Sequence, residues 1–153
     1  MDTNVLVQFK DLGAGLILGL SACGSALGAG VAGMAAIGAW KKSFIQNKPA
    51  SFILVALVAA PLTQTIYGNI VMTKVAELAA AGHYVWGIGA FCGLAIGLSA
   101  VLQGKCAAVA CDAMGETGKG FGNYLAVLGM TETVAVFVMV FSLMILGKFA
   151  GMQ

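Results

Sequence analysis

The chain has 153 residues, of which 60% are hydrophobic and only 9% are charged, and its formal net charge is +2. Its mean hydropathy of +0.97 lies far above that of an ordinary globular protein. This composition predicts an integral membrane protein. The few scattered lysines form no basic stripe, so nucleic acid is excluded as a partner.

Four apolar segments are long enough to cross about 30 Å of hydrocarbon as helices, for which roughly 20 residues suffice. They cover residues 12–40, 50–74, 84–111 and 121–147 and are separated by polar or helix-disfavouring connections. The sequence therefore predicts an all-α membrane protein, with four transmembrane helices arranged as two tandem hairpins. We expect a single membrane domain over residues 1–153, with hairpins at 11–76 and 84–148.

The apolar run that follows Lys10 is far too long for the core of a cleaved signal peptide, so we expect a retained span. Lysine placement then predicts the topology through the positive-inside rule. Five lysines fall on the side of the first and third connections and three on the other, namely Lys41, Lys42, Lys48, Lys105 and Lys119 against Lys10, Lys74 and Lys148. The two connections are expected in the cytoplasm and both termini outside.

The two hairpins repeat each other weakly and point the same way through the membrane. Two segments of the first hairpin align with two of the second. One alignment places Ser25 on Ser99, and the other places Thr63 on Thr131. A parallel repeat of this kind indicates an internal duplication. Gln64 then occupies the position of Glu132, so the duplicated carboxylate is present only once.

Glycines at spacings of four recur in the first and third segments, and such spacing lets helix backbones approach closely. They are Gly15 and Gly19, Gly24 and Gly28, and Gly89, Gly93 and Gly97. Small-residue helices inside and bulkier helices outside would suit many copies closing into a ring. Ordinary close packing within a monomeric four-helix bundle is the alternative.

Neither the glycines nor the cysteines indicate an enzyme. The segment from Gly28 to Gly33 matches the dinucleotide fingerprint G-x-G-x-x-G, but the strand and strand-to-helix turn that this motif needs are not predicted here. The four cysteines form no C-x-x-C pair and no metal-ligand spacing. We expect no catalytic residues and no permanently bound cofactor.

Glu132 is a lone carboxylate near the middle of the fourth apolar segment. An isolated charge at that depth costs at least ~2.5–3.5 kcal/mol by insertion scales, and such residues usually mark ion pathways or proton relays. Gln103 and Gln64 are expected at similar depth, because helices rise about 1.5 Å per residue. Thr63 and Tyr67 share one helix face with Gln64.

Carboxylate, amide, hydroxyl and carbonyl oxygens together make a site that suits a hard cation such as Na⁺. In the alternative, Glu132 carries a proton and its neighbours only hydrogen-bond it. Gln64 and Gln103 could instead serve simply to hold helices together by hydrogen bonds. Nearby, Pro61 is expected to disturb the helix, because its missing N–H leaves a carbonyl near residue 57 without a helical partner.

These features together resemble the duplicated proteolipid of V-type ATPases, the c or K subunit of the rotor ring. The resemblance rests on the glycine-rich double hairpin and on three short motifs, Thr63-Gln64 with Tyr67, Gln103-Gly104-Lys105 and Met130-Thr131-Glu132-Thr133. It is strongest to the sodium-binding bacterial members, which implies a location in a bacterial cell membrane.

The resemblance implies which residues ligate the transported Na⁺ and which residue closes its site. Glu132, Gln103, Gln64 and Thr63 match side-chain ligands, Ala60 falls at the position that gives a backbone carbonyl, and Tyr67 matches the tyrosine that closes the site on the carboxylate. Na⁺ or H⁺ would be carried at Glu132 around a ring in the lipid bilayer.

The implied partners are identical subunits, a central-shaft subunit and a stator subunit that supplies an arginine. The competing function is a stand-alone secondary ion transporter or channel that uses Glu132 for coupling. Such a protein is expected to show inverted repeats and broken helices in both halves. A purely structural membrane scaffold is the third class, and it would give Glu132 no role.

Overall fold

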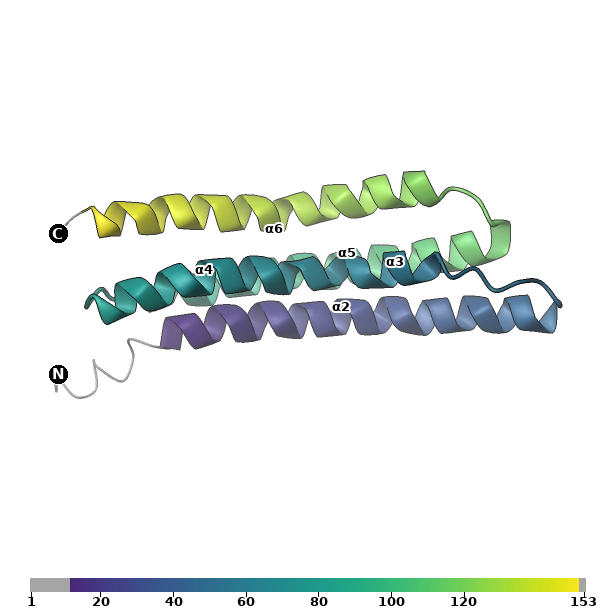
Figure 1. Ribbon diagram of the computed structural model, residues 1–153, viewed down its shortest axis with the longest axis horizontal. Coiled ribbons are helices and arrows are strands. Elements are labelled where there is room, and N and C mark those ends of the chain that lie inside the picture. Colours follow the sequence, from purple (N-terminus) through teal and green to yellow (C-terminus); the bar gives the residue numbers. More distant parts are fainter. Residues whose placement is uncertain (1–11, 152–153) are drawn as a thin grey trace.

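The computed structural model describes residues 12–151, so Lys10 and the expected first residue of the first hairpin, Asp11, lie outside the described residues. The elements are α2 (Leu12–Ile45), α3 (Leu54–Ala59), the 3₁₀ turn η1 (Ala60–Leu62), α4 (Thr63–Ala80), α5 (Trp86–Thr117) and α6 (Phe121–Ala150). Figure 1 shows long, nearly parallel rods, with the connections after α2 and α5 at one end.

The prediction of an all-α membrane fold is confirmed for the described residues. Four of their helical segments are long and apolar enough to cross a membrane, with α3, η1 and α4 together making one of them. The chain runs up and down through these segments, so α2 and α5 point the same way (Figure 1). This is the parallel arrangement that the repeat predicts.

Helices α2 and α5 pack backbone against backbone. A Cβ atom added at Gly24 would come within 2.2 Å of the Gly97 carbonyl oxygen, and one at Gly104 within 2.2 Å of the Gly28 Cα. Only glycine allows this approach, which brings many weak backbone contacts into range. The two glycine-rich helices therefore form one layer, and α5 is the most buried of the four spans while α6 is the least.

The second span is interrupted where Pro61 stands. The α-helical pattern changes there to the 3₁₀ turn η1, and α4 begins directly after it at Thr63. Proline lacks the N–H that an α-helix needs and its ring crowds the preceding turn, so the tighter turn relieves both problems. The disturbance expected near Pro61 is thus observed, and it sets where Thr63 and Gln64 begin the next helix.

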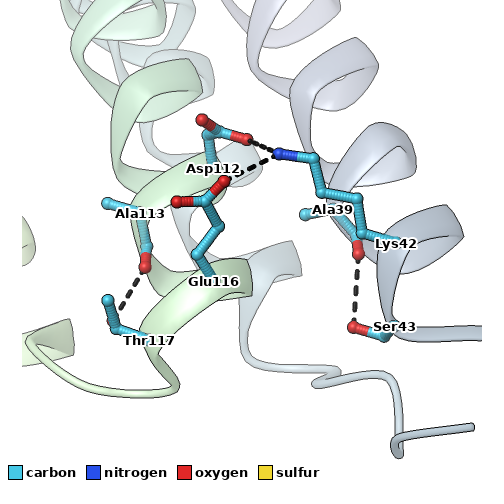
Figure 2. A network of polar contacts seen from close by, with 7 residues as sticks. All are labelled: Ala39, Lys42, Ser43, Asp112, Ala113, Glu116 and Thr117. Carbon is cyan, nitrogen blue, oxygen red and sulfur yellow. Dashed lines mark hydrogen bonds and ion pairs between the residues drawn. The ribbon is translucent and has the colours of Figure 1, made fainter. Parts of the chain in front are cut away.

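Helices α2 and α5 continue past the ends expected at residues 40 and 111, to Ile45 and Thr117. Lysines end an apolar run but do not end a helix, and here they add contacts. The Nζ of Lys42 lies 3.0 Å from Asp112 Oδ1 and 2.9 Å from Glu116 Oε1, which ties α2 to α5 (Figure 2). All three side chains are about half exposed, so each pair alone is worth little.

Two apolar clusters occupy the two halves of the molecule. One contains Leu54 and Leu57 with Ala107 and Leu128, on the side of the α2 and α5 connections. The other contains residues from the opposite half, namely Ile17, Val71, Val75, Leu78, Val85 and Leu146. The buried polar side chains Gln64 and Gln103 belong to neither cluster, so they form a polar layer between the two.

Candidate functional site

The polar layer is built from three helices that each contribute one long polar side chain. Gln64 comes from the first turn of α4, Gln103 from the middle of α5 and Glu132 from α6. Both glutamines have no exposed surface, whereas Glu132 is partly exposed at the outer side of the bundle. Buried amides are costly unless they are hydrogen-bonded, so their partners define the site.

A continuous chain of hydrogen bonds runs from Thr63 to Glu132. The Thr63 hydroxyl donates to Gln64 Oε1 at 3.2 Å, and Gln64 Nε2 donates to Gln103 Oε1 at 2.7 Å. Gln103 Nε2 in turn donates to Glu132 Oε2 at 3.3 Å and to the Leu128 carbonyl at 2.9 Å. Each amide therefore uses both its donor and its acceptor, and the chain links α4, α5 and α6.

Tyr67 holds the other oxygen of the carboxylate. Its hydroxyl donates to Glu132 Oε1 at 2.5 Å, from the turn of α4 that follows Gln64. Both carboxylate oxygens thus accept a hydrogen bond from another helix, one from α4 and one from α5. Hydrogen bonds to a carboxylate are among the stronger ones in proteins, so Glu132 is held in one orientation.

The Ala60 carbonyl lies at the edge of this network. It accepts the backbone N–H of Thr63 and also the Thr63 hydroxyl, at 3.0 Å. The arrangement repeats in the second hairpin, where the Thr131 hydroxyl donates to the Leu128 carbonyl at 2.8 Å. The proposed repeat superimposes Ala60 on Leu128, so the two hairpins carry the same local hydrogen bond at the same position.

Every residue predicted for the site therefore lies in or beside one hydrogen-bonded network. Sequence reasoning missed two of its members, the Leu128 carbonyl and Ser99, whose hydroxyl donates to the Thr131 carbonyl at 3.0 Å. The repeat could have indicated Leu128, because it superimposes Leu128 on Ala60. Thr133, in contrast, is exposed and donates to the Gly129 carbonyl of its own helix, outside the network.

The chemistry available to this site is that of oxygen ligands around one carboxylate. Gln103 turns its nitrogen toward Glu132 and its oxygen toward Gln64. An amide carries one oxygen and one NH₂ group, so a half-turn exchanges a donor for an acceptor. The same side chain can thus hydrogen-bond the carboxylate or offer an oxygen to a cation beside it.

Two comparisons with known proteins found similar sequences. Residues 86–145, which include α5 and most of α6, match the family of the ATP synthase C subunit. The chain is also similar to the A-type ATP synthase subunit K of Methanocaldococcus jannaschii, with 30% identity over 144 residues. This alignment covers 92% of the chain and 63% of the relative, so the chain spans less than two thirds of that protein's length.

Proposed function

We propose that the chain belongs to the ATP synthase C-subunit family and that it is an ion-carrying subunit of the membrane rotor of a rotary ATPase. It has no catalytic site of its own in this proposal. ATP would be hydrolysed or made elsewhere in the complex, and the chain would carry ions past a stationary membrane subunit. The observation that supports this most is the partly exposed carboxylate of Glu132, bridged to two other helices.

The position of Glu132 fits an ion carrier better than a structural role. Glu132 is itself partly exposed, and Gly129, one turn earlier on the same side of α6, is exposed, so the carboxylate lies beside a face open to lipid or to another subunit. A bare charge there would be expensive, whereas a carboxylate paired with a cation or a proton is close to neutral. Loading with an ion therefore lets Glu132 travel through lipid, and unloading requires a polar or cationic partner such as a stator arginine.

We further propose that the carried ion is Na⁺. Its ligands would be oxygens of Glu132, Gln103, Gln64 and Thr63 together with the Ala60 carbonyl, and Tyr67 would hold the carboxylate in place. Such an all-oxygen set suits a hard cation. A proton carrier would need only Glu132 and a hydrogen-bond partner, and the two fully buried amides would then contribute no more than helix packing.

Proton transport is the second candidate, and one observation favours it. Tyr67 and Gln103 both direct donors at the carboxylate, an arrangement that holds Glu132 without any metal ion. A stand-alone transporter is less well supported, because the helical break at η1 has no counterpart within α6, which is continuous from Phe121 to Ala150. The expected hallmark of that class, broken helices in both halves, is therefore not found in the described residues.

The proposed partners are further copies of the chain in a closed ring, a shaft subunit and a stator subunit. Orientation in the membrane is proposed from the lysines, with the α2–α3 and α5–α6 connections in the cytoplasm of a bacterial cell. The structure agrees with one premise of this proposal, since these two connections lie at the same end (Figure 1).

Carbodiimide labelling of the purified chain tests the proposal. The reagent attacks protonated carboxyl groups in apolar surroundings, so we expect an adduct at Glu132 and none at Glu77 or Glu116, whose carboxylates pair with lysines near the helix ends. Millimolar Na⁺ at constant pH and ionic strength, with K⁺ as the control salt, should slow the reaction. Labelling at Glu77 or Glu116 with Glu132 untouched would refute the site, and equal rates in Na⁺ and K⁺ would favour the proton.

A further inference from the structure

Ser25 is a buried serine of α2 whose hydroxyl has no hydrogen-bond partner among the described residues. The residue is only 2% exposed. Serines within helices commonly donate to the carbonyl four residues earlier, and Ser21, Ser43 and Ser142 each do so in this structure. Ser25 does not. A buried polar group without a partner is costly, so this hydroxyl needs an explanation.

Contacts on both sides of Ser25 fix the register of α2 on the second span. A Cβ atom added at Gly68 of α4 would lie 2.8 Å from Ser21 Cβ. One added at Gly28 of α2 would lie 3.0 Å from Pro61 Cβ. The two contacts are seven residues apart on each of the two chain segments, which run in opposite directions (Figure 1). The register is therefore the same before and after Ser25.

Gln64 occupies the position that faces this serine. It lies four residues before Gly68, just as Ser25 lies four residues after Ser21 on the antiparallel helix. Both side chains are buried, since Gln64 has no exposed surface and Ser25 has almost none. Ser25 thus faces an amide of the polar layer without bonding it in the arrangement described above.

The second hairpin supports this placement independently. The repeat places Ser25 on Ser99 and Thr63 on Thr131. Ser99 donates its hydroxyl to the Thr131 carbonyl at 3.0 Å, so the serine of the second hairpin lies beside the site. By the same relation, Ser25 lies beside Thr63 and Gln64. The two serines differ in that only Ser99 uses its hydroxyl.

The direction of the amide chain explains why the Ser25 hydroxyl is unused. Gln103 directs its nitrogen at Glu132 and accepts Gln64 Nε2 on its oxygen. The proposed Na⁺ site requires Gln103 to turn its oxygen toward a cation at Glu132. Its nitrogen would then face Gln64 Nε2, and two donors would oppose each other. Gln64 must therefore turn as well, so that its oxygen faces Gln103 and the cation.

This turn moves the nitrogen of Gln64 to the side where its oxygen now accepts the Thr63 hydroxyl. The Thr63 oxygen is itself a proposed ligand, so its lone pairs would point at the cation. Ser25 then provides the free acceptor. Its oxygen can accept from Gln64 Nε2 while its hydrogen donates to the Ser21 carbonyl, four residues earlier.

We infer that Ser25 is a positioning residue of the ion-loaded site, which holds Gln64 with its oxygen toward Na⁺ and does not touch the ion itself. The inference rests on the proposed Na⁺ site. It predicts a difference between the two candidate ions, because a proton on Glu132 does not require either amide to turn. Ser25→Ala should therefore weaken Na⁺ binding and leave the ion-free site unchanged, where the hydroxyl has no partner.

Carbodiimide labelling of Glu132 measures both states in one assay. Purified rings are labelled at constant pH and ionic strength while Na⁺ replaces K⁺. For Ser25→Ala we expect an unchanged labelling rate without Na⁺. The Na⁺ concentration that halves the rate should rise about fivefold, the loss that one ordinary hydrogen bond implies. Ser21→Ala is the matched control, because Ser21 is also buried but faces Gly68 one turn away, and its half-protecting concentration should stay within about twofold.

Each result of this assay bears on the inference. An unchanged half-protecting concentration in Ser25→Ala would overturn it, and so would equal shifts in Ser25→Ala and Ser21→Ala. A changed labelling rate without Na⁺ would show a general structural role and would also overturn it. If Na⁺ does not protect the unmodified chain, the proposed Na⁺ site fails and the inference fails with it. Protection of the unmodified chain with no effect of Ser25→Ala refutes the inference alone.

A structure of unmodified rings with bound Na⁺ decides the matter if Ser25→Ala rings do not assemble. We expect Ser25 Oγ within about 3.2 Å of the end of the Gln64 side chain. The Gln64 atom in contact with Na⁺ identifies the oxygen, so the atom beside Ser25 is the nitrogen. A water molecule, or the Ser21 carbonyl alone, as the partner of Ser25 in that structure would overturn the inference.

Discussion

Replacing Gln103 with Leu separates an ion ligand from a residue that merely fills space. Gln103 has no exposed surface and makes three hydrogen bonds, with Gln64 Nε2, the Leu128 carbonyl and Glu132 Oε2. Leucine has nearly the same volume, so Gln103→Leu leaves no large cavity. Among the described residues, Gln103 Oε1 is the acceptor found for Gln64 Nε2, and the substitution removes it.

The stability cost follows from that orphaned donor. A hydrogen bond between membrane helices contributes about 0.6 kcal/mol on average. A buried donor left without a partner costs more, about 1–3 kcal/mol. Because Gln64 is also fully buried, we expect Gln103→Leu to destabilise the ring by the larger amount. The double variant Gln64→Leu with Gln103→Leu removes both partners and should recover most of this loss.

Ion affinity should behave differently from stability. If Gln103 offers an oxygen to Na⁺, its loss should raise the Kd at least about tenfold, which corresponds to 1.4 kcal/mol. The double variant should bind Na⁺ still more weakly, although it is the more stable protein. Opposite trends in the two quantities would be hard to explain by helix packing alone.

Equilibrium binding of radioactive Na⁺ to purified rings measures the affinity, and thermal dissociation of the rings measures the stability. Ser99→Ala is the control, because it removes one hydrogen bond to the Thr131 carbonyl and leaves all proposed ligands in place. Its Kd should stay within about twofold of the original, a change below 0.5 kcal/mol. An unchanged Kd in assembled Gln103→Leu rings would refute the proposal that Gln103 is a ligand.

Two further predictions follow from the same structure. Glu132→Gln keeps an oxygen but loses the charge that neutralises a cation. Rings should therefore assemble, while ATP-driven Na⁺ uptake into vesicles should fall to background. Normal uptake would remove the basis of the proposed function. Gly93→Leu should prevent assembly, because even a Cβ there would lie 2.7 Å from Ile17 Cα. Gly147→Leu is the control and should assemble normally, because a Cβ at Gly147 meets nothing within 4 Å among the described residues. Equal native mass spectra for Gly93→Leu and Gly147→Leu would argue against close α2–α5 packing.

The sequence predicted the architecture well because the signals for it are averaged over many residues. Apolar runs of more than 20 residues and the weak repeat indicate four spans and two parallel hairpins without knowledge of any contact. The depth of Gln103 and Glu132 followed from the constant rise of a helix. The structure joins Gln64 to Gln103 and Gln103 to Glu132 by hydrogen bonds, and ion binding by this group stays a prediction.

Other features could not be read from the sequence. Lysines end an apolar run without ending a helix, so a local hydropathy pattern placed the ends of α2 and α5 too early and could not predict the contact between Lys42 and Glu116. The orientation of the Gln103 amide depends on its hydrogen bond to the Leu128 carbonyl. Every residue has a backbone carbonyl, so the sequence does not single this one out. Helix propensities carry no information about either contact.

The lengths of α2 and α5 have a mechanical consequence. Their 34 and 32 residues make rods of about 51 and 48 Å, which exceeds a hydrocarbon layer of about 30 Å by roughly 20 Å. Figure 1 shows both rods extending past the start of α3 and α6 at the end where Lys42 joins them. A partner that binds this end would contact two helices joined by ion pairs rather than connecting loops. A torque applied at this end would be transmitted along α2 and α5 to the layer of Glu132, because both helices are continuous.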